Sequence, residues 1–544
     1  MRASQSNFPR FTIPPWVTWL AIGLAPLVTS LALVQVSDGI VNFQGFVSFL
    51  VVCSMAAGLL VAGWVLLKYD SRLVLPGWLG GAVFCAVLLR LVAGLLWYSF
   101  LPVFGYGSPA ERAGYIMADA YHRDQAAWGL AQSEKPLQRS FTGYDKADQY
   151  GGLLYLSALI YRYFGGDFHR PLLMVVLAAA ASSLAVMFTW AFARRAWNEN
   201  VAKIAALALV LYPEALLLGS SQMREAFTLS LAIAGFYGLV RYWQDRKWAG
   251  LVIVVVALVI CLPLSPPFAA LLLVALGLQA VVIDKWKVVN QRNLWLVLGL
   301  LAILAGLGLW LAWSQFAPEG VSNPVAMVSW WVRRSAEWQA HLSERASGWL
   351  QRVFEHTPAW FHAPFLVSYG VVRPFLPAAL LESGIPIWRL IAIWRAVGWT
   401  ILLVFLLYAP VHALRTKQRL GFSSGLILVV WLVILIASLR GGGDLWDNPR
   451  YRAAFSGLQV ALASWVWAGQ QRQADPWLRR MLVGVGILLL WFVPWYLRRY
   501  TPIGWDIVDL FKTIGLGISS AILFFIWDWT RSSPQRSVGD KRAE

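Results

Sequence analysis

The sequence is poor in charged residues and in cysteine, and both shortages exclude classes of protein. Only 13% of its 544 residues are charged, whereas soluble domains carry about 25%, so an ordinary soluble fold is excluded. Cys53, Cys85 and Cys261 all lie in apolar runs, and they suit neither a disulfide framework nor a zinc site. The first apolar run, from Pro15, has no convincing small-residue cleavage site, so we expect a retained membrane anchor.

Apolar residues make up 59% of the chain. They recur in runs of about 20, each long enough to cross about 30 Å of hydrocarbon as a helix. The 32 tryptophans fit two membrane interfaces, where amphipathic rings collect. The net charge of +18 falls mostly in short loops, so the expected partners are membrane lipids with anionic headgroups and not nucleic acid. These features predict an all-α polytopic membrane protein.

The basic residues predict its topology. Lys68 and Arg72 place the loop after the second helix in the cytoplasm, because basic residues collect on that side of a plasma (inner) membrane. The polar region from Phe104 to Gly152 then lies outside, and both termini lie in the cytoplasm. About 14 crossings are expected, at 16–37, 46–67, 76–101, 171–193, 201–219, 225–242, 248–263, 267–284, 294–314, 387–413, 421–439, 452–470, 481–497 and 506–529.

The crossings divide the chain into four parts. These are a two-helix extension (1–75), a core (76–314) whose first outer loop is 102–170, an outer region (315–386) and a C-terminal set of helices (387–544). The stretch 150–164 is too short and polar to span, so we expect it to lie at the outer interface. In the outer region, one helix face is apolar, which predicts an amphipathic interfacial helix; its residues are Trp331, Trp338, Leu342, Trp349 and Val353.

Ionisable residues on the predicted outer side are the candidates for function. The acids there are Asp119, Asp124, Asp145, Asp148, Glu225, Asp444 and Asp447. The arginines, which topology alone would not favour outside, are Arg112, Arg123, Arg139, Arg224, Arg450 and Arg452. A guanidinium pairs with phosphate through two parallel hydrogen bonds, so an anionic group near the outer leaflet is a candidate ligand.

Several of these segments carry a family resemblance. Asp119-Ala-Tyr121 with the alanine-rich stretch after it, and Leu154-Tyr155 leading to Phe164-Gly165 and Arg170, are similar to the first outer loop of GT-C glycosyltransferases. More narrowly, they resemble the bacterial relatives of protein O-mannosyltransferases and of the lipid A aminoarabinose transferase. The hairpin at Ser220-Ser-Gln-Met-Arg-Glu225 and the run Pro449-Arg450-Tyr451-Arg452 resemble later parts of the same fold. The resemblance is best over 76–245, with an echo near 450.

The resemblance implies transfer of a sugar from a polyprenyl-phosphate donor to a lipid, glycan or protein acceptor on the outer face. Asp119 is the expected base, which takes the acceptor proton, and a single base with direct displacement implies inversion at the sugar. Cations would stabilise the leaving phosphate. The expected substrate-binding residues are Tyr121, His122, Arg123, Asp124, Arg224, Glu225, Arg450 and Arg452, with Arg440 behind them.

Two features depart from the family pattern. Two helices precede what would be the family's first helix, and Asp119 has Ala118 and Ala120 as neighbours where the family often has a second acid. No cofactor is expected, although Asp444 and Asp447 could hold a divalent cation with Asp119 instead of shaping a turn.

Simpler interpretations stay open. Asp119 could be a helix cap, His122 a solvated loop residue, and Arg224 with Glu225 a mutual ion pair. Arg90, inside the third helix, has no assigned role. A polymerase or ligase of lipid-linked glycans would also have many helices and outer arginines. A flippase would place its charges along a central cavity.

Overall fold

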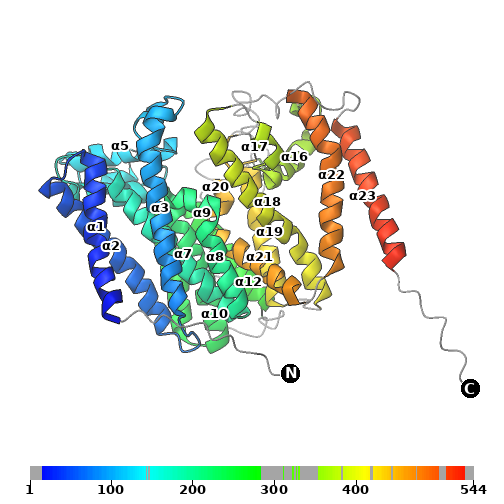
Figure 1. Ribbon diagram of the computed structural model, residues 1–544, viewed down its shortest axis with the longest axis horizontal. Helices are drawn as coiled ribbons and strands as arrows, with labels where there is room; N and C mark the ends of the chain where they lie inside the picture. The colour runs from blue at the N-terminus through cyan, green and yellow to red at the C-terminus, as the bar shows by residue number, and fades with distance from the viewer. Residues whose placement is uncertain are drawn as a thin grey trace, which may run out of the picture.

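The computed structural model describes residues 15–283, 353–416, 421–472, 475–500 and 510–532, apart from gaps at 143, 145–146, 382–383 and 443–444, together with isolated positions between 310 and 330. The crossing predicted at 294–314 (except Trp310), the tryptophan-rich face before Val353, Asp145 and Asp444 lie outside the described residues. Within the described ranges the secondary structure is helical throughout (Figure 1). The predicted class, an all-α polytopic membrane protein, is confirmed.

Eight of the described helices are long and apolar enough to cross a membrane. They are α2 (Phe43–Lys68), α3 (Gly77–Phe104), α7 (Leu172–Ala196), α12 (Pro266–Ile283), α18 (Pro386–Arg415), α19 (Phe422–Arg440), α22 (Pro476–Tyr500) and α23 (Leu510–Ser532). Four further predicted crossings also coincide with helices: α1 (Pro15–Asp38), α10 (Arg224–Asp245), α11 (Trp248–Leu264) and α21 (Ser456–Arg472).

The crossing predicted at 201–219 is broken. It forms α8 (Glu199–Leu211) and α9 (Pro213–Gly219), which are bent by 55° relative to each other. Proline disfavours the helical conformation of the residue before it, and Tyr212 accordingly has φ −65° and ψ 120°. After the break, α9 leads into the turn at residues 220–223, and α10 begins directly after this turn.

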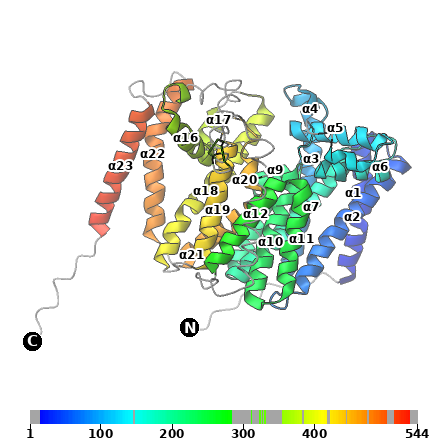
Figure 2. The ribbon, with the colours of Figure 1, turned by 180° about the vertical axis from the view of Figure 1, so that it is seen from behind.

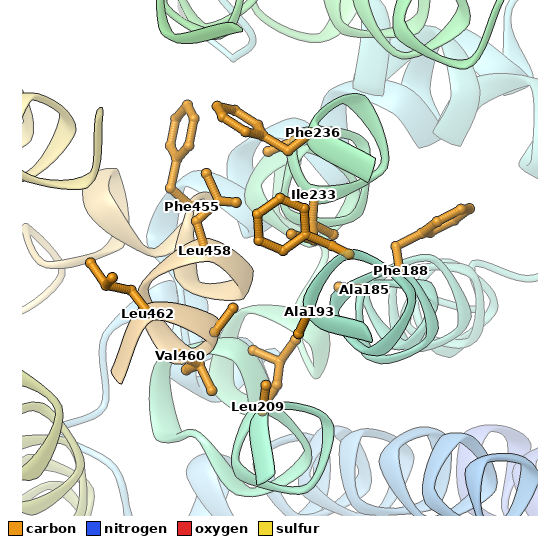
Figure 3. Packing of buried hydrophobic residues seen from close by; sticks show 14 of the residues in the cluster. Ala185, Phe188, Ala193, Leu209, Ile233, Phe236, Phe455, Leu458, Val460 and Leu462 are labelled. Atoms are coloured by element: carbon orange, nitrogen blue, oxygen red, sulfur yellow. The ribbon is translucent and has the colours of Figure 1, made fainter. Parts of the chain in front are cut away.

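Helix α7 is the centre of the bundle. Almost all of its residues are buried, including the small run Ala178–Ala181, which lets neighbouring helices approach closely. It packs against α2, α3, α8 and α10. Figure 3 shows Ala185, Phe188 and Ala193 of α7 among side chains of the surrounding helices, namely Leu209, Ile233, Phe236, Leu458 and Leu462. Helix α7 is therefore surrounded by protein and not by lipid.

Short helices gather at one end of the bundle, here called the site end (Figures 1 and 2). They are α4 (Pro109–Arg112), α5 (Ala118–Gln132), the 3-10 helix η1 (Leu137–Phe141), α6 (Gly152–Phe164), α16 (Ala359–Val372), α17 (Leu376–Leu381) and α20 (Arg450–Ala453). At 1.5 Å per residue, α6 is only about 20 Å long, less than the thickness of the hydrocarbon core.

Buried ion pairs tie the N-terminal helices to the core at both ends. At the site end, Arg170 contacts Asp38 through Nη2 at 2.7 Å and donates through Nη1 to the Gly165 carbonyl at 2.6 Å. At the opposite end, Arg195 pairs with Asp70 and, at 2.7 Å, with Asp245. Arg170 lies just before α7 and Arg195 lies in its last turn, so the two pairs fix α1 and α2 against this central helix.

Candidate functional site

Asp119 is the second residue of α5, and its position follows from the local sequence. The N-cap of α5 is Met117, which makes no side-chain cap hydrogen bond. Asp119 is therefore not the cap itself, although its negative charge lies in the first turn, where the helix dipole favours it. The carboxylate instead contacts Arg450, 331 residues away along the chain, with 2.7 Å between Oδ2 and Nη2.

Arg450 is the meeting point of three carboxylates from three elements. Besides Asp119, its Nη1 lies 3.3 Å from Asp447 Oδ2 and its Nε lies 4.0 Å from Glu225 Oε1. The Arg450 side chain is 9% exposed, whereas that of Asp119 is 49% exposed. Tyr451 packs under the same guanidinium, 5.3 Å from the ring centroid. Each edge of the guanidinium thus faces a different acid.

The charges set the protonation state of the pair. Burial works to raise the pKa of the Asp119 carboxyl, but the positive charges of Arg450, Arg123 and Arg224 outweigh it, so the pKa lies below the ordinary 3.8. Burial works to lower the pKa of Arg450, and the surrounding carboxylates, led by Glu225 and Asp447, raise it above its ordinary value. Asp119 is therefore a carboxylate and Arg450 a cation at neutral pH.

Arg123 and Arg224 form a second group, organised by Asp148. The Asp148 carboxylate is fully buried, 3.4 Å from Arg123 Nε and 3.9 Å from Arg224 Nη1. It also accepts the backbone N–H of Leu154 in the first turn of α6, at 3.2 Å. Sequence reasoning placed Asp148 among the outer acids without giving it a role. In both groups together, four carboxylates face three guanidinium groups.

Arg224 and Arg123 are each fixed by one further contact. The Arg224 guanidinium lies 5.0 Å from the centroid of the Tyr150 ring, and Arg123 Nη1 donates to the Gln222 carbonyl at 3.0 Å. Arg123 therefore holds α5 against the turn from which α10 begins.

Asp124 lies elsewhere, in the protein interior. Five residues along a helix turn it about 140° from Asp119, and its carboxylate accepts hydrogen bonds from the hydroxyls of Tyr115, at 2.5 Å, and Tyr161. His169 Nε2 lies 2.6 Å from the same group, and the His169 ring stacks on Trp128. These contacts anchor α5 to α6 and to the residues preceding α7.

Tyr121 is half-buried, and the next residue, His122, is exposed. Tyr121 packs edge-on against Tyr115, with 5.5 Å between ring centroids. His122 is exposed and makes an edge contact with Tyr121 at 5.3 Å.

Arg452 points away from Asp119. Residues two positions apart on a helix diverge by about 200°, so Arg452 lies on the opposite side of α20 from Arg450. It donates to the backbone carbonyls of Gly370, at 2.9 Å, and Arg373, at the end of α16. Its guanidinium stacks on Trp399 at 3.5 Å. Arg452 thus satisfies carbonyl groups at the C-terminal end of α16.

A buried pair that sequence reasoning missed fixes the segment before Arg450. Arg395 of α18 contacts both oxygens of Glu214 in α9, at 2.9 and 3.2 Å, and donates through Nη1 to the Trp446 carbonyl at 2.6 Å. Trp388 packs against the Trp446 ring at 4.8 Å. The signal was present, since a charge inside an apolar run marks a buried polar contact.

A small, partly open cleft lies between α3, α5, α7 and the 220–222 turn. Trp97 Nε1 donates to Ser220 Oγ there, at 2.9 Å. The cleft reaches Ala120, next to Asp119, but the predicted site residues do not line it. Its lining consists of Gly94, Trp97, Tyr98, Gly114, Tyr115, Ile116, Met117, Ala120, Pro171, Leu172, Val175, Ser220, Ser221 and Gln222.

The acids near Asp119 do not form a metal cluster with it in the described part of the chain. Within the part of the chain that the structure describes, no three His, Cys, Asp or Glu side chains are placed to share a metal ion. Asp444, an acid of the divalent-cation alternative, lies outside that part.

Comparisons with known proteins find a likeness among solved structures. No protein-family model and no curated protein matches the sequence. Among solved structures, the chain is similar to the archaeal oligosaccharyltransferase AglB from Archaeoglobus fulgidus in complex with an inhibitory peptide and a dolichol-phosphate, with a TM-score of 0.39 and 13% sequence identity. The match covers 84% of this chain and 56% of AglB, so the chain spans little more than half the length of that protein.

Proposed function

We propose that the chain is a GT-C-type glycosyltransferase that moves a sugar from a polyprenyl-phosphate donor to an acceptor at the outer face of the membrane. The single observation that carries the proposal is the contact of Asp119 with Arg450 at 2.7 Å. It joins a carboxylate in the first polar loop to a cation near the C-terminal helices, at the end of the bundle where the short helices lie.

The cations at this end suit a phosphate. Arg450 and Arg224 both have N–H groups directed toward acids, and the same groups can pair with phosphate oxygens. The first turns of α5 and α10 carry Asp119 and Arg224, and neither helix has a side-chain cap at its N-terminus. Free backbone N–H groups at a helix N-terminus favour anions. Four carboxylates nearby keep the guanidinium groups in place when no phosphate is bound.

The reaction that this arrangement can support is a direct displacement. A hydroxyl or amine of the acceptor attacks the anomeric carbon and forms the new bond to the sugar. Asp119 accepts the acceptor proton, and the bond from the anomeric carbon to the phosphate oxygen breaks, with its electron pair leaving on polyprenyl phosphate. Arg450 stabilises the charge that develops there. One displacement inverts the configuration at the sugar.

The test is sugar transfer by the Asp119→Asn variant. The amide keeps the size of the side chain but cannot accept the proton, so we expect transfer to fall by about 100-fold or more, the range for loss of a positioned base. The assay is mass spectrometry of envelope lipids and glycans from cells that carry either form. Glu134→Gln removes a charge just beyond the other end of α5 and is the matched control, with activity expected to stay near the wild-type level.

Full activity of Asp119→Asn would refute the assignment of the base. Protected translocation of a lipid without any sugar-transfer product would instead favour a flippase.

A further inference from the structure

The Arg450 guanidinium faces three carboxylates. Its Nη2 donates to Asp119 at 2.7 Å, its Nη1 lies 3.3 Å from Asp447, and its buried Nε, 4.0 Å from Glu225, makes no hydrogen bond to a described residue. A phosphate that pairs with a guanidinium uses two parallel N–H groups. Either pair of parallel N–H groups includes an η nitrogen, and the η nitrogens of Arg450 face Asp119 and Asp447, so a phosphate bound in this way competes with one of these two carboxylates.

Asp119 is the carboxylate that a phosphate can displace most easily. Its side chain is 49% exposed, against 25% for Asp447 and 13% for Glu225. An exposed ion pair is weak, because water solvates both partners. A released Asp119 also regains full contact with solvent, whereas the two other carboxylates would stay partly buried without their cation.

The backbone on both sides of Arg450 is held in place. The next arginine, Arg452, is bound to the carbonyls of Gly370 and Arg373 and stacked on Trp399. On the other side, Arg395 holds the Trp446 carbonyl at 2.6 Å. The segment from Trp446 to Arg452 is therefore anchored at both ends, which restricts movement of the Arg450 backbone.

From this geometry we infer that the donor phosphate and Asp119 compete for Arg450, so that donor binding releases Asp119 to act as the base. The inference rests on the proposed function. It sets an order in which the donor binds before the acceptor proton can be removed. A carboxylate paired with an arginine is a poor proton acceptor. When the phosphate replaces Asp119 at Arg450, Asp119 loses the full effect of that cation and gains a nearby anion, and both changes raise the basicity of its carboxylate.

The experiment measures binding of farnesyl phosphate, a short polyprenyl phosphate, to the full chain purified in detergent, by isothermal titration calorimetry. The variants are Asp119→Asn, Arg450→Gln and the double variant, with Glu134→Gln as the control for loss of one negative charge. We expect Asp119→Asn to bind the phosphate about threefold to fivefold tighter than wild type, the range that an exposed ion pair permits, although its sugar transfer is slower by about 100-fold or more.

Competition also predicts how the two changes combine. With Gln at position 450 the guanidinium for which Asp119 and the phosphate compete is gone, so adding Asp119→Asn should give no further gain in affinity. Glu134→Gln should leave the dissociation constant within about twofold of wild type, since separated surface charges are screened.

Three results would overturn the inference. If wild-type protein binds farnesyl phosphate but Asp119→Asn binds it no more tightly, the competition between Asp119 and the phosphate is overturned, while the proposed function is not. If Asp119→Asn raises the affinity for farnesyl phosphate by the same factor when position 450 is Gln, the gain comes from removing charge repulsion between Asp119 and the phosphate. That result also overturns the competition for Arg450. Absence of farnesyl phosphate binding by folded wild-type protein overturns the donor assignment in the proposed function, and the inference with it.

Discussion

The buried pair of Glu214 and Arg395 should be needed both for stability and for the position of Arg450. Its side chains are only 1% and 3% exposed. Glu214→Ala leaves the Arg395 guanidinium buried without its carboxylate, and loss of one partner of a buried pair costs about 3–5 kcal/mol of unfolding free energy. Arg395→Met leaves the opposite charge buried, and we expect a loss of the same size.

The double variant separates the two roles. Replacing both members of a buried pair by apolar residues of similar volume is often neutral or stabilising, so Glu214→Leu combined with Arg395→Met should recover most of the lost stability. It still lacks the N–H group that holds the Trp446 carbonyl. We therefore expect a stable protein with reduced sugar transfer, because the segment leading to Arg450 has lost one anchor.

The measurements are the free energy of unfolding in mixed SDS micelles and the rate of sugar transfer. The reasoning fails if Glu214→Ala costs less than about 1 kcal/mol, the value of an exposed pair. The positioning role fails if the stable double variant transfers sugar as fast as wild type.

Two further predictions concern the protonation of Asp119 and the packing of α6. The pKa of Asp119 is lowered below 3.8 in the folded protein, so its pair with Arg450 contributes stability that is complete above the unfolded-state pKa and is lost as pH falls through the lower folded-state value. The pH profile of kcat/KM reports the free enzyme, so its acid limb should lie below pH 3.8. If donor binding releases Asp119, the acid limb of the kcat profile should lie at a higher pH. Acid limbs at the same pH in both profiles would contradict the release. A Cβ at Gly152 would overlap the Pro263 carbonyl at the end of α11, whereas one at Gly129 on α5 would meet no atom within 4 Å. Gly152→Ala should therefore lower the unfolding temperature. The control Gly129→Ala should leave it unchanged or raise it, since alanine stabilises a helix by about 1 kcal/mol relative to glycine. Equal effects of the two changes would show that α6 does not need its close approach to α11.

Local signals predicted the helices well, because an apolar run specifies its own length. The crossings expected at 76–101 and 171–193 are α3 (Gly77–Phe104) and α7 (Leu172–Ala196). The short stretch expected at 150–164 is α6 (Gly152–Phe164). The break between α8 and α9 was missed, although Pro213 marks it, because hydropathy alone does not register the lost backbone N–H.

The direction of each side chain could not be predicted in this way. Arg450 and Arg452 are two residues apart and looked equivalent as phosphate ligands, yet they lie on opposite sides of α20. Asp119 and Asp124 share one helix, but one carboxylate is half exposed and the other is buried among tyrosines. The angular position of a residue around its helix decides which way its side chain points. What that side chain meets depends on where the neighbouring helices pack.

The sequence by itself determined the class of protein, most of its helices and the polar loop that holds Asp119, since charge and hydropathy act over a few residues. Only the tertiary structure decided which cation meets that carboxylate. Asp119 and Arg450 are 331 residues apart, and their contact depends on how the α5 loop, the α9–α10 turn and the Arg395-anchored segment pack at one end of the bundle. Such a contact forms only when packing of many helices offsets the entropy of closing so long a loop.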